Sequence, residues 1–147
     1  MEIISPVFRS GGVIPSPYTC IGQNVNPPFN FLNVPSKTQS LALIMHDPDA
    51  PGGDYLHWLV WDITPATDFI AVNSVPVGAM QGQNGSGKSV YMGPCPPSGT
   101  HRYLFDLYAL DTTLDLPSGS SLDEVEKAMA GHIIEEANLT GNFSAKT

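Results

Sequence analysis

Proline is spread along almost the whole chain, and this distribution is the strongest constraint on the fold. The sequence holds 14 prolines and 14 glycines among 147 residues. Proline has no backbone N–H and clashes with the preceding helical turn, so it breaks helices and is confined to turns and edge strands. The first third of the chain contains Pro6, Pro15, Pro17, Pro27, Pro28 and Pro35. We therefore predict short edge strands and turns in that third.

Three segments are predicted to be core strands. Residues 41–45 (LALIM) are continuously apolar, as in a strand that is buried on both faces. Residues 57–63 (HWLVWDI) and 103–110 (YLFDLYAL) are rich in the aromatic and branched residues that favour strands. A long irregular stretch, residues 76–99, separates the last two, and loops of that length are usually functional. The length fits one domain over residues 1–147.

One amphipathic helix is predicted near the end of the sequence. Ser121 and Glu124 have the spacing of a capping box. Apolar residues then recur at helical spacing, with acidic residues between them: Val125, Ala128, Met129, Ile133 and Ala137. Gly131 weakens the pattern. We expect the helix to end near residues 138–141 and Phe143 to return to the sheet.

The charge balance excludes some partners. The chain has 14 acidic and 6 basic residues, so its field repels nucleic acid and anionic membranes. No apolar run is long enough to span a membrane, and the first residues lack the apolar stretch of a secretory signal. We predict a cytoplasmic protein that binds no nucleic acid and makes no integral membrane contact. In such a protein Cys20 and Cys95 are expected to be free thiols.

Residues 82–89 (GQNGSGKS) match the phosphate-loop pattern of nucleotide hydrolases letter for letter. That loop works because a helix begins directly after it and holds the phosphates at its N-terminus. Here Pro94, Pro96 and Pro97 follow within a few residues and prevent a helix. We interpret the match as a coincidence, and we predict no enzyme activity because no other segment carries a catalytic signature.

Two carboxylates and two histidines are predicted to meet in space. Asp47 and Asp49 follow the first core strand with Pro48 between them, and alternation lets both point the same way. His57 and His101 lie at the starts of the other two core strands. A carboxylate beside an imidazole stabilises its protonated form and fixes its tautomer, which yields a donor for phosphate or carboxylate. The pattern indicates an anion pocket whose carboxylates orient the histidines.

Each of these residues also has a structural interpretation. Asp-Pro pairs are common in turns, and a single histidine in a strand is often structural. His46 should face away from Asp47 if strand alternation holds. Tyr103 and Trp58 suit a core, although Tyr103 also offers a hydroxyl, and Arg102 is able to hold a neighbouring carboxylate. The same carboxylates and histidines also suit a divalent metal, so a metal-dependent enzyme is the remote alternative.

Taken together, these segments resemble the phosphatidylethanolamine-binding family, which includes the Raf kinase inhibitor proteins and small bacterial and archaeal relatives. The resemblance spans nearly the whole chain. Its most specific motifs are SLALIMHDPDAP at residues 40–51 and YMGPCPPSGTHRY at residues 91–103. The resemblance implies a mainly β fold: an antiparallel Greek-key β-sandwich with one or two peripheral helices, and a small cavity at one end that binds phosphate-like groups.

Carried over position by position, the resemblance also implies the cavity lining: Asp47, Asp49, Pro51, His57, Gly93, Pro94, Cys95, His101 and Tyr103. It implies a cis peptide bond before Pro51. We expect no cofactor and no metal. The expected function is a regulatory module that binds a phospholigand or another small phosphate-like or carboxylate anion. The alternative is an inhibitor of kinases or serine proteases that acts through residues 52–55 and 76–89. A homodimer is also expected, because small prokaryotic relatives often form dimers.

Overall fold

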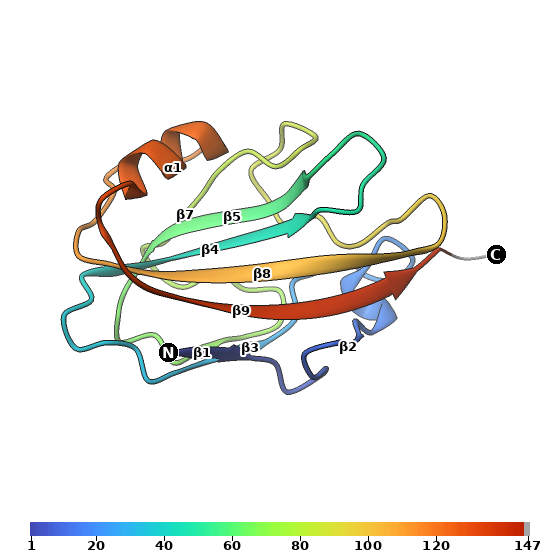
Figure 1. Ribbon diagram of the computed structural model, residues 1–147, viewed down its shortest axis with the longest axis horizontal. Coiled ribbons are helices and arrows are strands. Elements are labelled where there is room, and N and C mark those ends of the chain that lie inside the picture. The colour runs from blue at the N-terminus through green and yellow to red at the C-terminus, as the bar shows by residue number, and fades with distance from the viewer. Residues whose placement is uncertain (146–147) are drawn as a thin grey trace.

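Two β-sheets face each other across the main hydrophobic core, as the computed structural model of the chain shows (Figure 1). The structure describes residues 1–145. The smaller sheet has the order β1 (Glu2–Ile4), β3 (Phe29–Leu32), β6 (Phe69–Ile70). The larger sheet has the order β2 (Gly12–Val13), β9 (Ile133–Ser144), β8 (Thr100–Leu110), β4 (Ser40–Asp47), β5 (Tyr55–Ile63), β7 (Met80–Gln81). A short 3-10 helix, η1 (Ser16–Tyr18), and one α-helix, α1 (Leu122–Met129), complete the fold. The predicted mainly β fold class is confirmed.

The three predicted core strands are β4, β5 and β8, and β4 lies between the other two. Both pairings are antiparallel, with Asp47 opposite Tyr55 and His46 opposite Leu104. In residues 1–145 the pairing of β2 with β9 is the one parallel contact. Because antiparallel neighbours run in opposite directions, the end of β4 and the starts of β5 and β8 lie at the same end of the sheet. This convergence positions the predicted polar residues.

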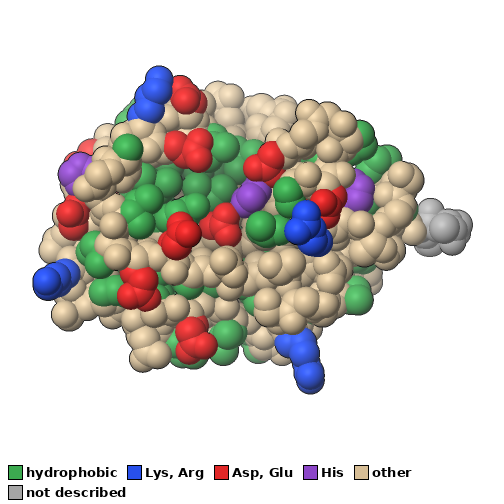
Figure 2. Space-filling view, in the orientation of Figure 1, with side chains coloured by type: hydrophobic (Ala, Val, Ile, Leu, Met, Phe, Trp, Pro, Cys, Tyr) green, Lys and Arg blue, Asp and Glu red, His purple; other side chains and the backbone are tan. Residues whose placement is uncertain are grey.

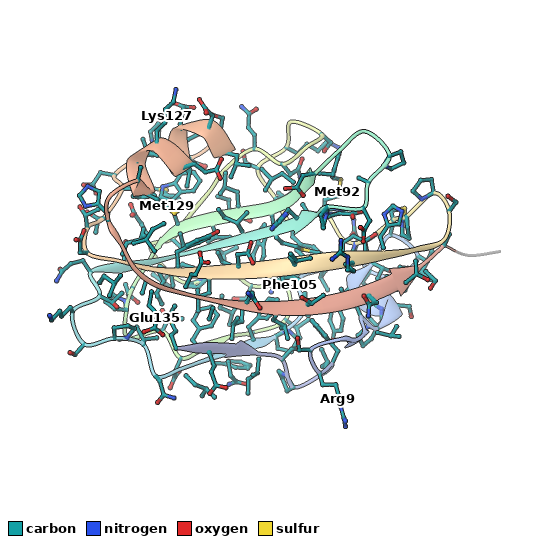
Figure 3. The ribbon with its side chains drawn as sticks, viewed as in Figure 1. Arg9, Met92, Phe105, Lys127, Met129 and Glu135 are labelled. Atoms are coloured by element: carbon teal, nitrogen blue, oxygen red, sulfur yellow. A yellow bond between two sulfur atoms is a disulfide. The ribbon has the colours of Figure 1, made fainter. Side chains whose placement is uncertain are left out.

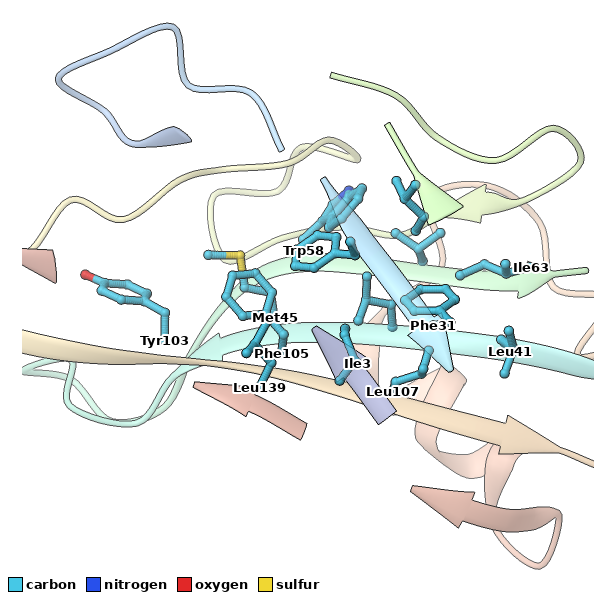
Figure 4. Close-up of a cluster of buried hydrophobic side chains, with 14 of the residues drawn as sticks. Ile3, Phe31, Leu41, Met45, Trp58, Ile63, Tyr103, Phe105, Leu107 and Leu139 are labelled. Carbon is cyan, nitrogen blue, oxygen red and sulfur yellow. The ribbon is translucent and has the colours of Figure 1, made fainter. Parts of the chain in front are cut away.

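β4 is buried on both faces, which explains why its sequence is continuously apolar. Leu41, Leu43 and Met45 face the smaller sheet and join the main core cluster (Figure 4). Ala42 and Ile44 face the other way and join a second cluster beneath α1. Since successive side chains of a strand point to opposite faces, a strand between two apolar layers needs apolar residues at every position.

The last third of the chain corrects the predicted helix. The capping box of Ser121 and Glu124 is present, but α1 ends at Met129 rather than near residues 138–141. Gly131 adopts a φ of 81°, the left-handed conformation that ends helices, and β9 then begins at Ile133. Pairing of β9 with β8 along almost its whole length outweighs the helical spacing of its apolar residues. The predicted return of Phe143 to the sheet is confirmed.

Cys20 and Cys95, which were expected to be free thiols, form a disulfide. The bond joins the loop after η1 to the irregular segment before β8. The expectation of free thiols followed from the predicted cytoplasmic location, because thiols in the cytosol are normally kept reduced. Disulfides are typical of oxidising compartments and, as an exception, of intracellular proteins of hyperthermophiles. The disulfide therefore gives no support to a cytoplasmic location. Among residues 1–145, no helix has the length and apolar composition that crossing a membrane requires.

His46 lies on the opposite face of the sheet from the predicted site, in a surface groove with Ile44 and Tyr108. Figure 2 shows an apolar hollow on this face with acidic side chains around it. The ring of His46 bridges two of these acids: its Nδ1 lies 2.8 Å from Asp54 Oδ1 and its Nε2 lies 2.7 Å from Asp106 Oδ2. The bridge ties the loop between β4 and β5 to the middle of β8. His46 thus faces away from Asp47, as predicted.

We predict that the free energy of unfolding depends on the charge of His46. Hydrogen bonds to Asp106 and Asp54 outweigh partial burial and raise the pKa of His46 from 6.5 to about 9. Because the folded-state pKa is the higher one, the stabilisation is complete below pH 6.5 and is lost as the pH rises through about 9. With screening at this partly exposed site, we expect a loss of about 2 kcal/mol.

Urea unfolding over a series of pH values measures this effect. His46→Gln should flatten the decrease in stability between about pH 7 and about pH 10. His132→Gln is the control, because His132 contacts a single carboxylate, that of Asp111, through one ring nitrogen on an exposed part of the surface. An identical decrease in wild type and His46→Gln would contradict the prediction.

Candidate functional site

A cavity of about 230 Å³ opens where β4 ends and where β5 and β8 begin. Its lining consists of Asp47, Ala50, Pro51, Tyr55, His57, Met92, Gly93, Cys95, Pro96, Pro97, His101 and Tyr103. Most of the residues that the sequence predicts for the site therefore lie together. Asp49 and Pro94 are the two that do not line the cavity.

Asp47 and His101 form a buried hydrogen-bonded pair. Asp47 is only 3% exposed, and its Oδ2 accepts a hydrogen bond of 2.7 Å from Nδ1 of His101. Its Oδ1 accepts the backbone N–H of Asp49 at 2.8 Å. Both carboxylate oxygens are thus engaged within the protein. Because Nδ1 of His101 faces Asp47, Nε2 is the ring nitrogen that is left for a ligand.

His57 takes its tautomer from the backbone and not from a carboxylate. Its Nδ1 lies 2.6 Å from the carbonyl oxygen of Met92, and a carbonyl only accepts, so Nδ1 carries the proton. Burial lowers the pKa of His57, and it outweighs the opposite effects of Met92 and Asp47. At neutral pH the ring is therefore uncharged and Nε2 is an acceptor. The prediction that a carboxylate keeps both imidazoles protonated is wrong for His57.

Tyr103 lies between the two histidines, and its hydroxyl is unpaired. Its ring centroid is 5.3 Å from that of His57 and 6.4 Å from that of His101. Burial raises the pKa of Tyr103, so the phenol is neutral. The backbone of Cys95 is close enough to oppose this shift, but the hydroxyl makes no hydrogen bond of normal geometry. Figure 4 shows the hydroxyl pointing away from the core cluster.

Asp49 binds Arg102 at the surface beside the cavity. Its Oδ2 accepts the backbone N–H and the Nε–H of Arg102, both at 2.9 Å, and its Oδ1 accepts from the terminal nitrogen at 2.9 Å. The guanidinium holds the pKa of Asp49 well below its usual range. His101 and Arg102 are consecutive in β8 and point to opposite faces, so their two carboxylate partners also diverge.

The prediction that Asp47 and Asp49 point the same way is therefore wrong. The hydrogen bond from the Asp49 N–H to Asp47 Oδ1 forms a turn directly after β4. The extended alternation on which the prediction depended ends at that turn. A second correction concerns Pro51: peptide bonds within residues 1–145 are all trans. The cis bond expected before Pro51 is absent there, in line with the intrinsic trans preference of X–Pro bonds of about 0.5–1 kcal/mol.

The segment of residues 91–95 forms one wall of the cavity. In Figure 3, Met92 of this segment lies away from Met129 of α1. Four contacts fasten it to the loop around η1: Tyr91 OH to Tyr18 O, Gly93 N to Asn24 Oδ1, Cys20 N to Pro94 O, and the Cys20–Cys95 disulfide. The packing leaves no room at Gly93, where a Cβ would lie 2.3 Å from the Tyr18 carbonyl oxygen. The wall is therefore held from outside the cavity.

The rest of the lining is apolar, and the sequence analysis did not identify it: Ala50, Tyr55, Met92, Pro96 and Pro97. Tyr55 precedes His57 by two positions in β5, and residues two apart in a strand lie on the same face, so strand alternation could have predicted Tyr55. Met92 contributes a backbone carbonyl to His57, and no side-chain pattern reveals such a contact.

Residues 82–89, which match the phosphate-loop pattern, lead into irregular chain and not into a helix. Asn84 organises this loop, since its Oδ1 accepts the backbone N–H groups of Ser86 and Lys88. Gly85 packs against the ring of Tyr55, and a Cβ there would lie 2.4 Å from that ring. The segment thus supports the rim of the cavity.

The donor set is small. Among residues 1–145, no group of three or more His, Cys, Asp and Glu side chains gathers in a way that could hold a metal ion. Asp49, the second predicted carboxylate, is bound to Arg102. The arrangement instead offers one neutral acceptor on His57, one hydroxyl on Tyr103, and Nε2 of His101, all of which can bond to a small oxygen-bearing group.

Comparison with known proteins identifies the family of the chain. The family model described as phosphatidylethanolamine-binding protein matches residues 4–144. A UPF0098 protein of Methanothermobacter thermautotrophicus is 47% identical over 97% of this chain and 98% of its own length. A UPF0098 protein of Chlamydia pneumoniae is 43% identical with the same coverage of both chains.

Solved structures show the same similarity. The crystal structure of a putative phosphatidylethanolamine-binding protein homolog from Chlamydia trachomatis has a TM-score of 0.95 and 37% identity, covering 99% of this chain and 97% of that one. E. coli YbcL, described as a new member of the mammalian family, has a TM-score of 0.91 and 30% identity over 99% of this chain and 98% of its own. This chain belongs to the phosphatidylethanolamine-binding protein family.

Proposed function

We propose that this protein is a regulatory binding module whose cavity takes a small ligand bearing a phosphate-like or carboxylate group. The observation that carries the proposal is the unpaired hydroxyl of Tyr103, which lies between the rings of His57 and His101. A buried hydroxyl without a partner costs about 1–3 kcal/mol. A ligand oxygen in the cavity would remove this cost, and the two Nε2 atoms would bind the same group.

The protonation of the histidines favours a ligand that both donates and accepts. Neutral His57 presents an acceptor at Nε2. A singly protonated phosphate ester has one P–O–H that can donate to His57 and other oxygens that can accept from Tyr103. His101 adds an N–H donor when its ring is protonated. A dianion without a proton binds in this way only if His57 takes up a proton first.

The apolar rim favours an ester over a bare anion. Tyr55, Met92 and Pro96 line the same cavity as the histidines. Their surfaces can cover an organic group that is attached to the phosphate or carboxylate. The net charge of -8 does not oppose this, because hydrogen-bond donors in a small cavity act locally. The roles as a kinase or protease inhibitor and as a homodimer stay predictions.

We predict that Tyr103→Phe separates binding from stability. The change removes the unpaired hydroxyl but keeps the buried ring. The free energy of unfolding should stay the same or rise by about 1 kcal/mol, because no hydrogen bond is lost. Calorimetric titration with inorganic phosphate and with phosphoethanolamine should show affinity that is weaker by about fivefold to tenfold. Tyr108→Phe, outside the cavity, is the control. Unchanged phosphate affinity in Tyr103→Phe would refute the proposal.

We predict that anion affinity increases as the pH falls. Burial holds the pKa of His57 below its ordinary value in the free protein, and a bound anion stabilises the protonated ring. Binding therefore takes up a proton. Sulfate is the best probe, because it does not titrate between about pH 5 and about pH 8, where histidine does.

Histidine ring signals in NMR spectra with and without sulfate measure this linkage. The pKa of His57 should rise when sulfate is present. The ring of His132, which pairs with Asp111 outside the cavity, should not respond. Sulfate binding that is independent of pH and leaves the His57 signals unchanged would count against the role of this ring.

We predict that the disulfide supports binding through the cavity wall. Cys95 lines the cavity, and its bond to Cys20 is one of the contacts that fasten residues 91–95. The double variant Cys20→Ser/Cys95→Ser should bind phosphate about fivefold more weakly, because the wall then has to be ordered during binding. It should also lose about 4 kcal/mol of stability, the value for a loop of this length.

Binding is measured at a low temperature at which circular dichroism shows that the double variant keeps its β-sheet. Wild type treated with a dithiol should behave as the double variant does. Equal phosphate affinity in the folded variant and in wild type would show that the disulfide stabilises the chain without positioning the site.

A further inference from the structure

A second cavity, of about 320 Å³, lies next to the segment of residues 91–95: Tyr91 lines this cavity, and the next residue, Met92, lines the first. It is lined from segments that are distant in the sequence, including Asn24, Asn26, Trp58, Ser74, Gln81 and Tyr91. None of its lining residues carries a charge. It shares no lining residue with the anion cavity, so it is a separate site on the molecule.

The hydrogen bonds of the cavity determine what two of its side chains can offer. Gln81 Oε1 accepts the indole N–H of Trp58 at 2.7 Å, and Asn24 Oδ1 accepts the backbone N–H of Gly93 at 2.8 Å. An indole N–H and a backbone N–H are donors only, so the orientation of both amides is fixed. Each amide therefore has its NH₂ group left to donate.

The walls around these amides are fixed before any ligand arrives. Asn26 is buried, and its side chain bonds to the carbonyls of Pro27 and Ala71 and to the N–H of Ser74. Tyr91 bonds to the Tyr18 carbonyl and packs edge to face on Trp58, with ring centroids 5.5 Å apart. In Figure 4 the ring nitrogen of Trp58 points outward from the core cluster. A cavity with prearranged walls loses little entropy on binding.

We propose that this cavity binds an uncharged, oxygen-rich small molecule of the sugar class. The two NH₂ groups call for acceptor oxygens, such as hydroxyl, ring or carbonyl oxygens. The half-buried ring of Tyr91 suits the C–H face of a sugar ring, whereas Trp58 is only 1% exposed and takes part through the indole N–H that it donates to Gln81. A charged ligand would lose its hydration without finding an opposite charge, which excludes anions and cations.

The two tryptophans allow a direct test in solution. The indole N–H of Trp58 is bonded to Gln81 in this cavity, whereas that of Trp61 faces Leu116 in the second core cluster. NMR titration with N-acetylglucosamine should shift the Trp58 indole signal with a dissociation constant of about 1 mM or a few times that value. The Trp61 signal should stay in place. Glucosamine and glucuronate, which carry a charge, should bind at least about tenfold more weakly.

Gln81→Glu tests the amide donor specifically. The substitution keeps an acceptor for the Trp58 indole N–H but removes the NH₂ group. It should weaken N-acetylglucosamine binding by about tenfold. Gln83→Glu is the matched control, because it makes the same change at a neighbouring exposed glutamine that does not line the cavity, and it should bind as wild type does.

The proposal is overturned if N-acetylglucosamine at about 10 mM leaves the Trp58 signal in its original position. It is also overturned if the charged sugars bind equally well, or if Gln81→Glu and Gln83→Glu behave alike. Gln81→Glu places a carboxylate on the Trp58 indole N–H, so the Trp58 signal of the free variant is expected to move. A Trp61 indole signal at its wild-type position shows that the variant is folded. None of these readouts depends on anion binding, so failure of one proposal leaves the other open to its own test.

Discussion

The pairing of β4 with β5 and β8 is the constraint on which the rest of the structure depends. β4 has apolar layers on both faces. Each of its large side chains contributes about 1.5–3 kcal/mol to the stability of the folded protein when it is fully buried. Burial on both faces also sets the register, since a shift of one residue would exchange the two layers. With the register set, Asp47, His57 and His101 meet at one end of the sheet. The polar site is thus a consequence of apolar packing.

Histidine illustrates how the same side chain differs with its surroundings at this sheet. His46 lies at a partly exposed position between two carboxylates, which raise its pKa to about 9. His57 is more buried, and its nearest partner is the neutral carbonyl of Met92, so desolvation dominates and lowers its pKa. One ring is therefore a cation that ties a loop to the sheet, and the other is a neutral acceptor inside a cavity.

What the sequence could predict follows from how local each signal is. The strands around residues 41–45, 57–63 and 103–110 have compositions that identify them without knowledge of their neighbours. The strand after Gly131 does not, because its pairing with β8 is remote in sequence and overrides a local helical spacing. The cavity residues were predicted as a set mainly through the family resemblance. The divergence of Asp47 and Asp49 and the neutral state of His57 depend on a turn and on a backbone carbonyl, which residue types alone do not reveal.

The segment of residues 91–95 links the two cavities because its backbone serves both of them. The Met92 carbonyl fixes the tautomer of His57 on one side, and the N–H of the next residue, Gly93, fixes the Asn24 amide on the other. A displacement of this segment would alter an acceptor in the first cavity and a donor in the second cavity at the same time. The contacts to Tyr18 and Cys20 hold the segment in place, and both come from the loop around η1. The prediction of short edge strands in the proline-rich N-terminal part holds for β1 and β2 but not for β3, which is the middle strand of the smaller sheet. The same part of the chain also fixes residues 91–95 in place.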